Sequence, residues 1–274
     1  MRTIGIIPAR YGSTRLPGKA LALIAGEPMV WHVYQRASQA RSLAEVIVAT
    51  DDERIRRAVL ERGGEAVLTR PDHASGTDRL AEVAASLDCD LVVNIQGDEP
   101  LMEPEAIDAA VAPFLTEPNL RMSTAATPIS GAEEYRDPAA VKVVLDERGY
   151  ALYFSRAPLP FFRLPQSRPE TGWKPVLRGT RLDSASGASD NTFHDPHTGL
   201  TALKHLGLYV YRRETLLWLS QMQPTALEQA EKLEQLRALG HGCPIRVVVV
   251  GYSPLGVDTE EDLARVRELM NDES

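Results

Sequence analysis

Short apolar runs alternate with segments of helical periodicity along most of this 274-residue chain. This alternation is typical of an α/β fold, in which helices cover both faces of a mostly parallel sheet. The first half therefore predicts a βαβαβαβ arrangement. The predicted strands are Thr3–Pro8, Glu45–Thr50, Ala66–Thr69 and Leu91–Gln96. The predicted helices are Met29–Ala40, Glu53–Glu61 and Asp78–Leu87.

The second half mixes its elements, and a turn at Gly149 between two short apolar runs predicts an antiparallel pair. The predicted strands are Met122–Ile129, Val141–Asp146, Ala151–Ser155, Gly207–Tyr211 and Ile245–Val250. The predicted helices are Glu105–Phe114, Thr215–Gln221, Leu227–Leu239 and Glu260–Met270. Residues 163–203 are rich in Pro, Gly, Ser, Thr and Asp and form an insertion. Such an insertion is a lid, a binding arm or a disordered segment, and composition does not choose among them.

Composition excludes several classes of function. A net charge of -8 argues against bulk nucleic-acid binding, because a surface that tracks phosphates carries excess Lys and Arg. Cys89 and Cys243 are far apart, which favours neither a disulfide framework nor a cysteine-rich zinc site. No segment reads as a signal peptide or a bilayer-spanning helix. We expect a cytoplasmic protein with no membrane or nucleic-acid partner.

The loop Pro8–Lys19 follows the apolar run Ile4–Ile7 and combines two arginines and a lysine with glycines. Backbone N–H groups of such a loop can face phosphate oxygens while the basic side chains neutralise charge. The alternative is a basic surface loop. The spacing from Gly12 to Gly18 is one residue too long for a Walker A loop, and no G-x-G-x-x-G follows the first strand. The first difference argues against kinase chemistry that uses a Walker A loop, and the second argues against hydride transfer with a dinucleotide.

Carboxylates follow two of the predicted strands. Asp98 comes directly after the run Leu91–Gln96, at the sheet edge where α/β proteins hold their ligands, and is placed to bind a divalent cation. Asp258 follows the last strand and is a second candidate. Both segments have a simpler interpretation as helix caps. His194 and His197 suggest a metal more weakly, because histidines in a polar segment are usually solvated.

In this order, the motifs resemble the 3-deoxy-manno-octulosonate cytidylyltransferase (CMP-Kdo synthetase) family almost from end to end. They are Pro8–Lys19, Val48–Asp51, Thr69-Arg70, Asp72-His73, Ser75–Arg79, Gln96–Pro100, Ala140–Asp146, Gly149–Arg156, His205–Gly207 with Tyr209, Leu233–Arg237 and Gly256–Asp262. The insertion after Phe162 is longer and more polar than the family segment it resembles.

The resemblance implies a glycosyltransferase-A-like, Rossmann-related fold in one domain over residues 1–274. A nucleotide-binding half would occupy 1–120, and a sugar-binding and dimerisation half would occupy 121–274. It also implies that CTP and the sugar acid Kdo give CMP-Kdo and pyrophosphate for lipopolysaccharide biosynthesis, with Mg²⁺ as cofactor. Relatives form homodimers, and the apolar patch Leu159–Phe162 is a candidate interface that could equally pack internally.

Functional residues carry over from the family by position. The expected catalytic residues are Arg10, Arg15, Lys19 and Asp98, and the expected metal ligands are Asp98 and Asp258. The expected CTP-binding residues are Ala9, Arg10, Gly12, Lys19, Thr50, Asp51, Arg70, Ser75, Gly76 and Arg79. The expected sugar-acid residues are Gln96, Arg156, His205, Tyr209, Glu234 and Gln235.

Structural interpretations stay open for several of these residues. Ser75 or Thr77 could cap the helix that follows, with or without binding the base. On one helix over Leu227–Leu239, Leu233 and Leu236 would face the core and leave Glu234 and Gln235 on another face, where both could simply be solvated. Alternative functions are a cytidylyltransferase for sialic acid or 8-amino-Kdo, a sugar nucleotidyltransferase using another base, and a non-catalytic nucleotide-binding protein.

Overall fold

The computed structural model describes residues 1–12, 15–73, 75–162, 192–195 and 198–272. The chain forms two compact units. The first unit comprises Met1–Thr124, Gly207–Met222 and Tyr252–Ser274, and the second comprises Ala125–Leu206 and Gln223–Gly251. The expectation of one domain divided near residue 120 stays a prediction.

A parallel sheet forms the centre of the first unit. Its strands follow the order β6-β1-β4-β5, with β6 also pairing with the antiparallel strand β10. Their bounds are β1 Thr3–Ala9, β4 Glu45–Thr50, β5 Glu65–Leu68, β6 Leu91–Asn94 and β10 Leu203–Arg212. The branched side chains of Ile4, Ile6 and Ile7 are fully buried, as expected for a strand covered on both faces.

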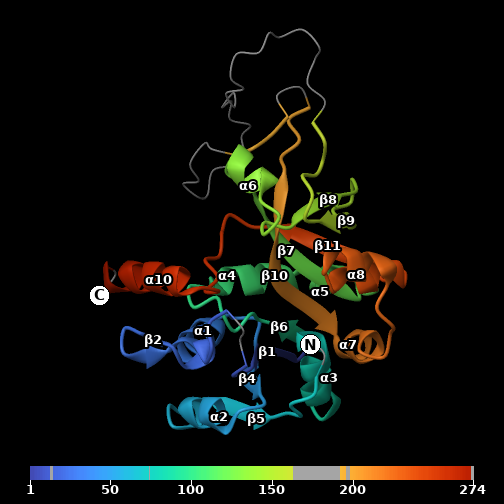
Figure 1. Ribbon diagram of the computed structural model, residues 1–274. Coiled ribbons are helices and arrows are strands. Elements are labelled where there is room, and N and C mark those ends of the chain that lie inside the picture. Colours follow the sequence, from blue (N-terminus) through green and yellow to red (C-terminus); the bar gives the residue numbers. More distant parts are fainter. Residues whose placement is uncertain (13–14, 74, 163–191, 196–197, 273–274) are drawn as a thin grey trace. The chain divides into compact units, whose positions relative to one another are not determined.

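Helices cover this sheet on both faces. The connections β1-α1-β4 and β4-α2-β5 run in one direction across the sheet, whereas the connection from β5 through α3 to β6 runs back. Because such crossovers are right-handed, α3 lies on the face of the sheet opposite α1 and α2 (Figure 1). The helices of this unit are α1 Met29–Ala37, α2 Glu53–Leu60, α3 Gly76–Ala85, α4 Pro104–Val111, α5 Pro113–Thr116, α7 Arg213–Leu219 and α10 Glu260–Asp272. None of the helices in the described part of the chain is long and apolar enough to cross a membrane.

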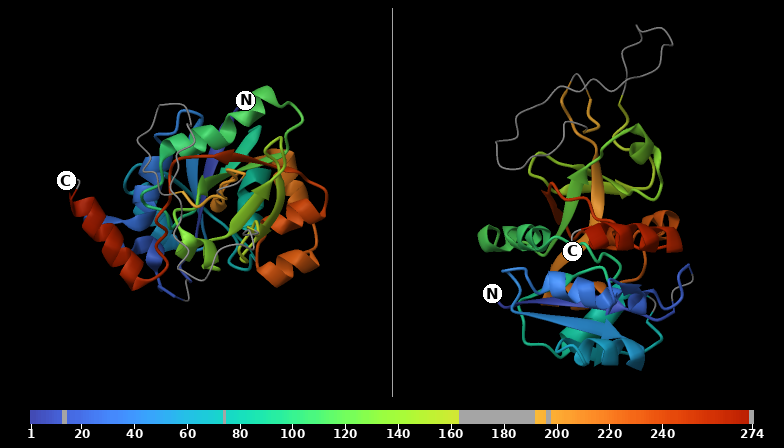
Figure 2. Two further views of the ribbon diagram at one scale, coloured as in Figure 1. Left: turned by 90° about the horizontal axis from the view of Figure 1, so that it is seen from above. Right: turned by 90° about the vertical axis from the view of Figure 1, so that its left-hand side faces the viewer.

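The C-terminal helix α10 lies beside a small hairpin of β2 (Leu23–Ile24) and β3 (Glu27–Pro28), near α1 (Figure 2). Its buried face joins a separate apolar cluster that also contains residues of the loop after β1. The cluster comprises Leu16, Ile24, Met29, Val257, Leu263 and Val266. Packing thus fixes the loop after β1 and the segment before α10 against the same core.

The second unit contains the predicted antiparallel pair. Strands β8 and β9 pair about Gly149, whose φ of 80° is in the left-handed region that favours glycine. The elements that lie mainly in this unit are β7 Met122–Pro128, α6 Ala132–Arg136, β8 Lys142–Leu145, β9 Ala151–Ser155, α8 Ala226–Glu231, α9 Gln235–Gly240 and β11 Ile245–Val249. A second apolar cluster, which includes stacked Tyr135 and Phe193, packs in this unit.

The structure confirms the predicted α/β class, corrects two predicted helices and adds two elements that were not predicted. The hairpin β2–β3 and helix α6 were not predicted, because their apolar patterns are too short to show a period. The helix predicted over Glu105–Phe114 divides at Pro113, which has no N–H to continue the hydrogen-bond ladder. The helix predicted over Leu227–Leu239 is wrong, because Lys232 is left-handed, with φ 56°, and separates α8 from α9.

This break changes the placement of the residues after it. Leu233 and Leu236 are buried as predicted. Gln235 is also buried, with 5% of its surface exposed, so the expectation that it lies on a face away from the core is wrong. Glu234 is exposed.

Replacing Lys232 by glycine tests the cost of the left-handed break. We expect Lys232→Gly to raise the free energy of unfolding by about 0.5–1 kcal/mol, because a residue with a Cβ is strained in this region. Lys232→Ala is the control, because it removes the same charge and keeps a Cβ. Equal stability of the two variants in urea denaturation would contradict the assignment of strain to this residue.

Candidate active site

The loop after β1 is fixed at its C-terminal end by main-chain bonds. Gly18 adopts φ 70°, and its N–H donates to the carbonyl of Tyr11 at 3.1 Å. The N–H of Lys19 donates to the carbonyl of Leu16 at 3.1 Å, and Leu16 is buried in the cluster under α10. The left-handed Gly18 therefore turns the chain so that Lys19 begins the short 3₁₀ helix η1 (Lys19–Leu21).

An aromatic contact braces the same loop from α2. The Arg54 guanidinium lies 3.6 Å from the centre of the Tyr11 ring, a cation–π distance. Arg54 is itself held by Asp52 through bonds of 2.9 Å from Nε and 2.6 Å from Nη2, and Asp52 also caps α2. The ring lies so close to Gly18 that a Cβ there would meet it at 3.1 Å. Sequence reasoning missed this brace, because no local pattern links Tyr11 to Arg54.

Lys19 lies among acidic groups from two distant segments. Its Nζ donates to Asp98 Oδ2 at 2.6 Å, to Asp258 Oδ1 at 3.1 Å and to the carbonyl of Val257 at 3.2 Å. These three acceptors match the three N–H donors of an ammonium group. Arg15 reaches the same Asp258 oxygen at 3.0 Å. The structure thus brings together four of the residues that the sequence selects: Arg15, Lys19, Asp98 and Asp258.

The electrostatics of this cluster keep the lysine charged. Burial by itself lowers the pKa of Lys19, but the charges and hydrogen bonds of Asp98 and Asp258 outweigh burial and raise it above its ordinary value. The ammonium form therefore persists through neutral pH. The side chains of Lys19, Asp98 and Asp258 are 18%, 28% and 41% exposed, so solvent and a charged ligand can reach the cluster.

Close backbone packing positions both carboxylates. A Cβ on Gly97 would lie 2.9 Å from the carbonyl oxygen of Pro8, so only glycine lets this loop approach β1. The N–H of Val257 then donates to the carbonyl of Asp98 at 2.8 Å, which joins the two acidic segments. The capping interpretation is wrong for Asp98, because Glu103 is the N-cap residue of α4.

Before α10, Thr259 and Asp262 make the capping bonds. The Asp262 carboxylate accepts from the Thr259 N–H at 2.9 Å, and the Asp262 N–H donates to the Thr259 hydroxyl at 3.2 Å. The carboxylate of Asp258 faces Lys19 and Arg15 instead.

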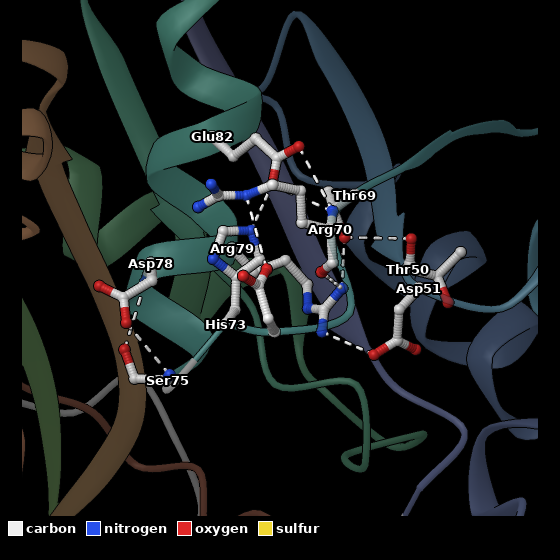
Figure 3. Close-up of polar contacts among 10 residues, drawn as sticks. Thr50, Asp51, Thr69, Arg70, His73, Ser75, Asp78, Arg79 and Glu82 are labelled. Carbon is white, nitrogen blue, oxygen red and sulfur yellow. Dashed lines mark hydrogen bonds and ion pairs between the residues drawn. The ribbon is translucent and has the colours of Figure 1, made fainter.

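The residues expected near the base form a buried network around Arg79 (Figure 3). The Arg79 guanidinium donates to Asp51 at 2.8 Å and to the hydroxyl of Thr69. Its side chain is 5% exposed. The Thr69 hydroxyl donates in turn to the carbonyl of Thr50 at 3.1 Å, linking the ends of β4 and β5. Arg79 and Asp51, both expected to bind CTP, thus pair with each other.

Glu82 on α3 holds the segment after β5 (Figure 3), and sequence reasoning missed it. Its carboxylate accepts from the Arg70 N–H at 3.2 Å and pairs with the buried His73 ring. Burial raises the pKa of Glu82, but the bonds from His73 and Arg70 lower it more, so the carboxylate stays ionised. Ser75 caps α3 in a reciprocal capping box with Asp78, which confirms the capping interpretation for Ser75.

Other predicted residues of the first unit vary in exposure. Arg10 and Gly12 are exposed on the loop after β1, whereas Ala9 is buried. The Gln96 amide donates to the carbonyl of Gly207 at 2.8 Å, and a Cβ on Gly207 would clash with that side chain. Tyr209 stacks on Tyr211 with ring centres 6.0 Å apart.

The remaining residues expected to bind the sugar acid belong to the second unit. Arg156 donates from Nε to the carbonyl of Glu231 at 2.8 Å and from Nη1 to that of Pro138 at 3.0 Å. The His205 ring meets Phe154 edge-on at 5.0 Å, and burial lowers the pKa of His205 to about 3, which keeps the ring neutral. Glu234 and Gln235 lie at the start of α9.

Two further candidates from the sequence are a metal site at His194 and His197 and an apolar contact at Leu159–Phe162. Across the described ranges, no group of three or more His, Cys, Asp or Glu side chains could hold a metal ion by itself. His194 bonds to the carbonyl of Thr192, while His197 and insertion residues 163–191 lie outside the described residues. In the patch Leu159–Phe162, Phe162 packs on Tyr135, whereas Phe161 is 85% exposed.

Alanine substitutions at two glycines test the brace on the loop. We expect Gly18→Ala to lower the free energy of unfolding by about 1–2 kcal/mol, because the new Cβ is left-handed and meets the Tyr11 ring. Gly12→Ala is the matched control, because its Cβ would meet nothing within 4 Å. Thermal unfolding of both variants compares them, and equal losses would contradict the role given to the Tyr11 contact.

Comparison with known proteins places this geometry in a family. The family model described as "Cytidylyltransferase" matches residues 4–245. The 3-deoxy-manno-octulosonate cytidylyltransferase of Geobacter sulfurreducens is 51% identical over 98% of this chain and 99% of its own length, and that of Geotalea daltonii is 50% identical over 99% of each.

Solved structures agree with these relatives. A CMP:2-keto-3-deoxy-manno-octonic acid synthetase complexed with CTP superposes with a TM-score of 0.84, at 40% identity over the whole of both chains. A cytidylyltransferase from Leptospira borgpetersenii shares the fold at a TM-score of 0.59 and 16% identity over 99% of this chain and 87% of that one. The chain is an enzyme of the nucleotidyltransferase class and belongs to the 3-deoxy-manno-octulosonate cytidylyltransferase family.

Proposed function

We propose that this enzyme activates 3-deoxy-D-manno-octulosonate (Kdo) with CTP, giving CMP-Kdo and pyrophosphate for lipopolysaccharide biosynthesis. The relatives that bear this name match the chain over nearly its full length. The observation that carries the proposal is the position of the Lys19 ammonium within hydrogen-bond distance of both Asp98 and Asp258. Cations and carboxylates concentrated at one sheet edge suit a reaction in which charge moves along a triphosphate.

The reaction is a nucleotidyl transfer. The anomeric hydroxyl of the sugar acid attacks the α-phosphorus of CTP in line and gives its proton to solvent. The bond from the α-phosphorus to the oxygen that bridges to the β-phosphate breaks, and pyrophosphate leaves. Negative charge grows on the phosphate oxygens, so positioning and charge neutralisation matter more than a protein nucleophile. In this proposal Lys19 stabilises the α-phosphate, while Arg10 and Arg15 hold the departing pyrophosphate.

The carboxylates around Lys19 suit Mg²⁺. Hard cations prefer oxygen ligands, and Mg²⁺ typically combines one or two carboxylates with substrate phosphates. Asp98 and Asp258 provide such a pair, and the ammonium between them occupies a position that favours positive charge. Each carboxylate uses one oxygen for Lys19 and has a second oxygen that can ligate a cation. Bound Mg²⁺ would neutralise phosphate charge and lower the pKa of the attacking hydroxyl.

The network around Arg79 supports selection of a small base. Because Arg79 is bonded to Asp51 and Thr69, we assign it the task of holding the ends of β4 and β5 against α3 rather than touching the base. Backbone groups at Ser75 and Gly76, together with Arg70, would then meet the polar edge of cytosine. A purine could not reproduce those hydrogen bonds in a short turn.

The wider assignments follow from the same family. We propose that Gln96, Arg156, His205, Tyr209, Glu234 and Gln235 bind the sugar acid. The enzyme would work in the cytoplasm as a homodimer, with Leu159–Phe162 as a candidate contact.

Asp98→Asn tests the metal assignment. We expect kcat to fall by at least about 100-fold, because an amide cannot supply the charge that holds the cation and balances Lys19. The circular dichroism spectrum and melting temperature should stay close to those of the wild type. Asp88→Asn is the control, because Asp88 is exposed in the same unit and its substitution removes the same charge. Normal pyrophosphate release by Asp98→Asn would refute the metal assignment.

A panel of substrates tests specificity. We expect pyrophosphate release from CTP with Kdo in the presence of Mg²⁺, and at least about 100-fold lower kcat/KM with ATP or GTP, because polar groups of the base site would stay unpaired. Equal use of ATP or GTP would refute the assignment of the base site. A higher kcat/KM with sialic acid or 8-amino-Kdo than with Kdo would identify that acid as the substrate instead. Binding of CTP without turnover of any sugar acid would indicate a non-catalytic protein.

A further inference from the structure

The second unit contains a carboxylate that sequence reasoning did not select. Glu231 is the last residue of α8, next to the left-handed Lys232. A negative side chain at a helix C-terminus is electrostatically unfavourable, because the exposed carbonyls carry partial negative charge and favour Lys or Arg. A glutamate at this position therefore needs compensation from outside its own helix.

The compensation comes from the end of β9. The Ser155 hydroxyl donates to Glu231 Oε1 at 2.6 Å, the Arg156 N–H donates to Oε2 at 3.0 Å, and the Tyr153 hydroxyl bonds to the same carboxylate. The Glu231 main-chain carbonyl accepts from Arg156 Nε at 2.8 Å. Burial raises the pKa of Glu231, but these bonds and the charge of Arg156 lower it more. The carboxylate therefore stays ionised and fully bonded at neutral pH.

The same junction carries other residues assigned to the sugar acid. Glu234 is the N-cap residue of α9, shortly after Glu231 in the sequence, and Gln235 begins that helix. Arg237 on α9 pairs with Glu228 on α8 at 2.6 Å, and both side chains are largely buried, so an ion pair joins the two short helices. Glu231 bonds this helix pair to the end of β9, next to Arg156.

We propose that Glu231 is a positioning residue for the sugar acid, which sets the place of Arg156 relative to Glu234 and Gln235. The inference rests on the proposed function and deepens it. Glu231 acts through its neighbours and needs no contact with substrate. Its ionised carboxylate holds the Arg156 N–H and the Ser155 hydroxyl, and so fixes the end of β9 against the end of α8. A polyhydroxylated acid requires several hydrogen-bond groups in fixed positions.

Steady-state kinetics of Glu231→Gln test the proposal. The amide keeps the shape of the side chain but loses its charge. Its single oxygen cannot replace both carboxylate oxygens, one of which accepts from Ser155 and the other from Arg156. We expect the KM for Kdo to rise about tenfold or more, the loss typical of a charge-assisted hydrogen bond. The KM for CTP should stay within about twofold, because the base and phosphate residues belong to the first unit. A purely structural role would change both constants together.

Two further variants sharpen the test. Ser155→Ala removes one donor to the same carboxylate, so we expect a smaller rise in the KM for Kdo that is not additive with Glu231→Gln. Glu147→Gln is the control, because Glu147 is exposed in the same unit and its substitution removes the same charge. Hydrogen exchange of the Arg156 amide should be faster in Glu231→Gln and unchanged in Glu147→Gln.

The outcomes separate this inference from the proposed function. If the wild type turns over Kdo but Glu231→Gln leaves its KM unchanged, or raises both KM values equally, the positioning role is overturned and the function stands. If the wild type releases no pyrophosphate with any sugar acid, the proposed function fails and the inference fails with it. A selective rise in the KM for Kdo, absent in Glu147→Gln, supports both.

Discussion

The site is organised by the attraction between one ammonium group and two carboxylates that are far apart in sequence. Lys19 follows the first strand, Asp98 follows β6, and Asp258 precedes α10. Nevertheless, Lys19 Nζ lies 2.6 Å from Asp98 Oδ2 and 3.1 Å from Asp258 Oδ1. Such a cluster is stable only because opposite charges compensate one another in a partly buried place. The cluster also presents positive and negative groups to a ligand. A metal-bound triphosphate carries both signs of charge and can pair with both kinds of group.

The fold creates this meeting through close backbone approach rather than through the charges alone. The parallel order β6-β1-β4 brings the carboxyl ends of three strands to one edge, where an α/β sheet has its ligand site. Gly97 lets the Asp98 loop touch β1, Gly18 turns the chain into Lys19, and Val257 is bonded to Asp98. Leu16 and Val257 are buried in one cluster, so apolar packing under α10 supports the polar site above it.

Much of this arrangement could be predicted from the sequence, because strands such as β4 and β9 and the residues after them have strong local patterns. The resemblance to a family identified Lys19, Asp98 and Asp258 together, which spacing alone could not do. The short hairpin β2–β3 and helix α6 were missed because their patterns show no period, and the missed side-chain contacts depend on tertiary packing. Arg54 stacks on Tyr11, Glu82 holds His73 and Glu231 holds the end of β9, and nothing local signals any of these pairs. The break at Lys232 was missed because Leu233 and Leu236 keep the spacing expected of one continuous helix.

In the proposed mechanism, the Lys19 cluster receives the triphosphate together with a divalent cation. A crystal structure of the enzyme with CTP and Mn²⁺, measured at the manganese absorption edge, tests it directly. We expect an anomalous peak within bonding distance of Asp98 or Asp258, with the α-phosphate beside the Lys19 ammonium. Manganese bound elsewhere, or a triphosphate that touches none of these three residues, would contradict it.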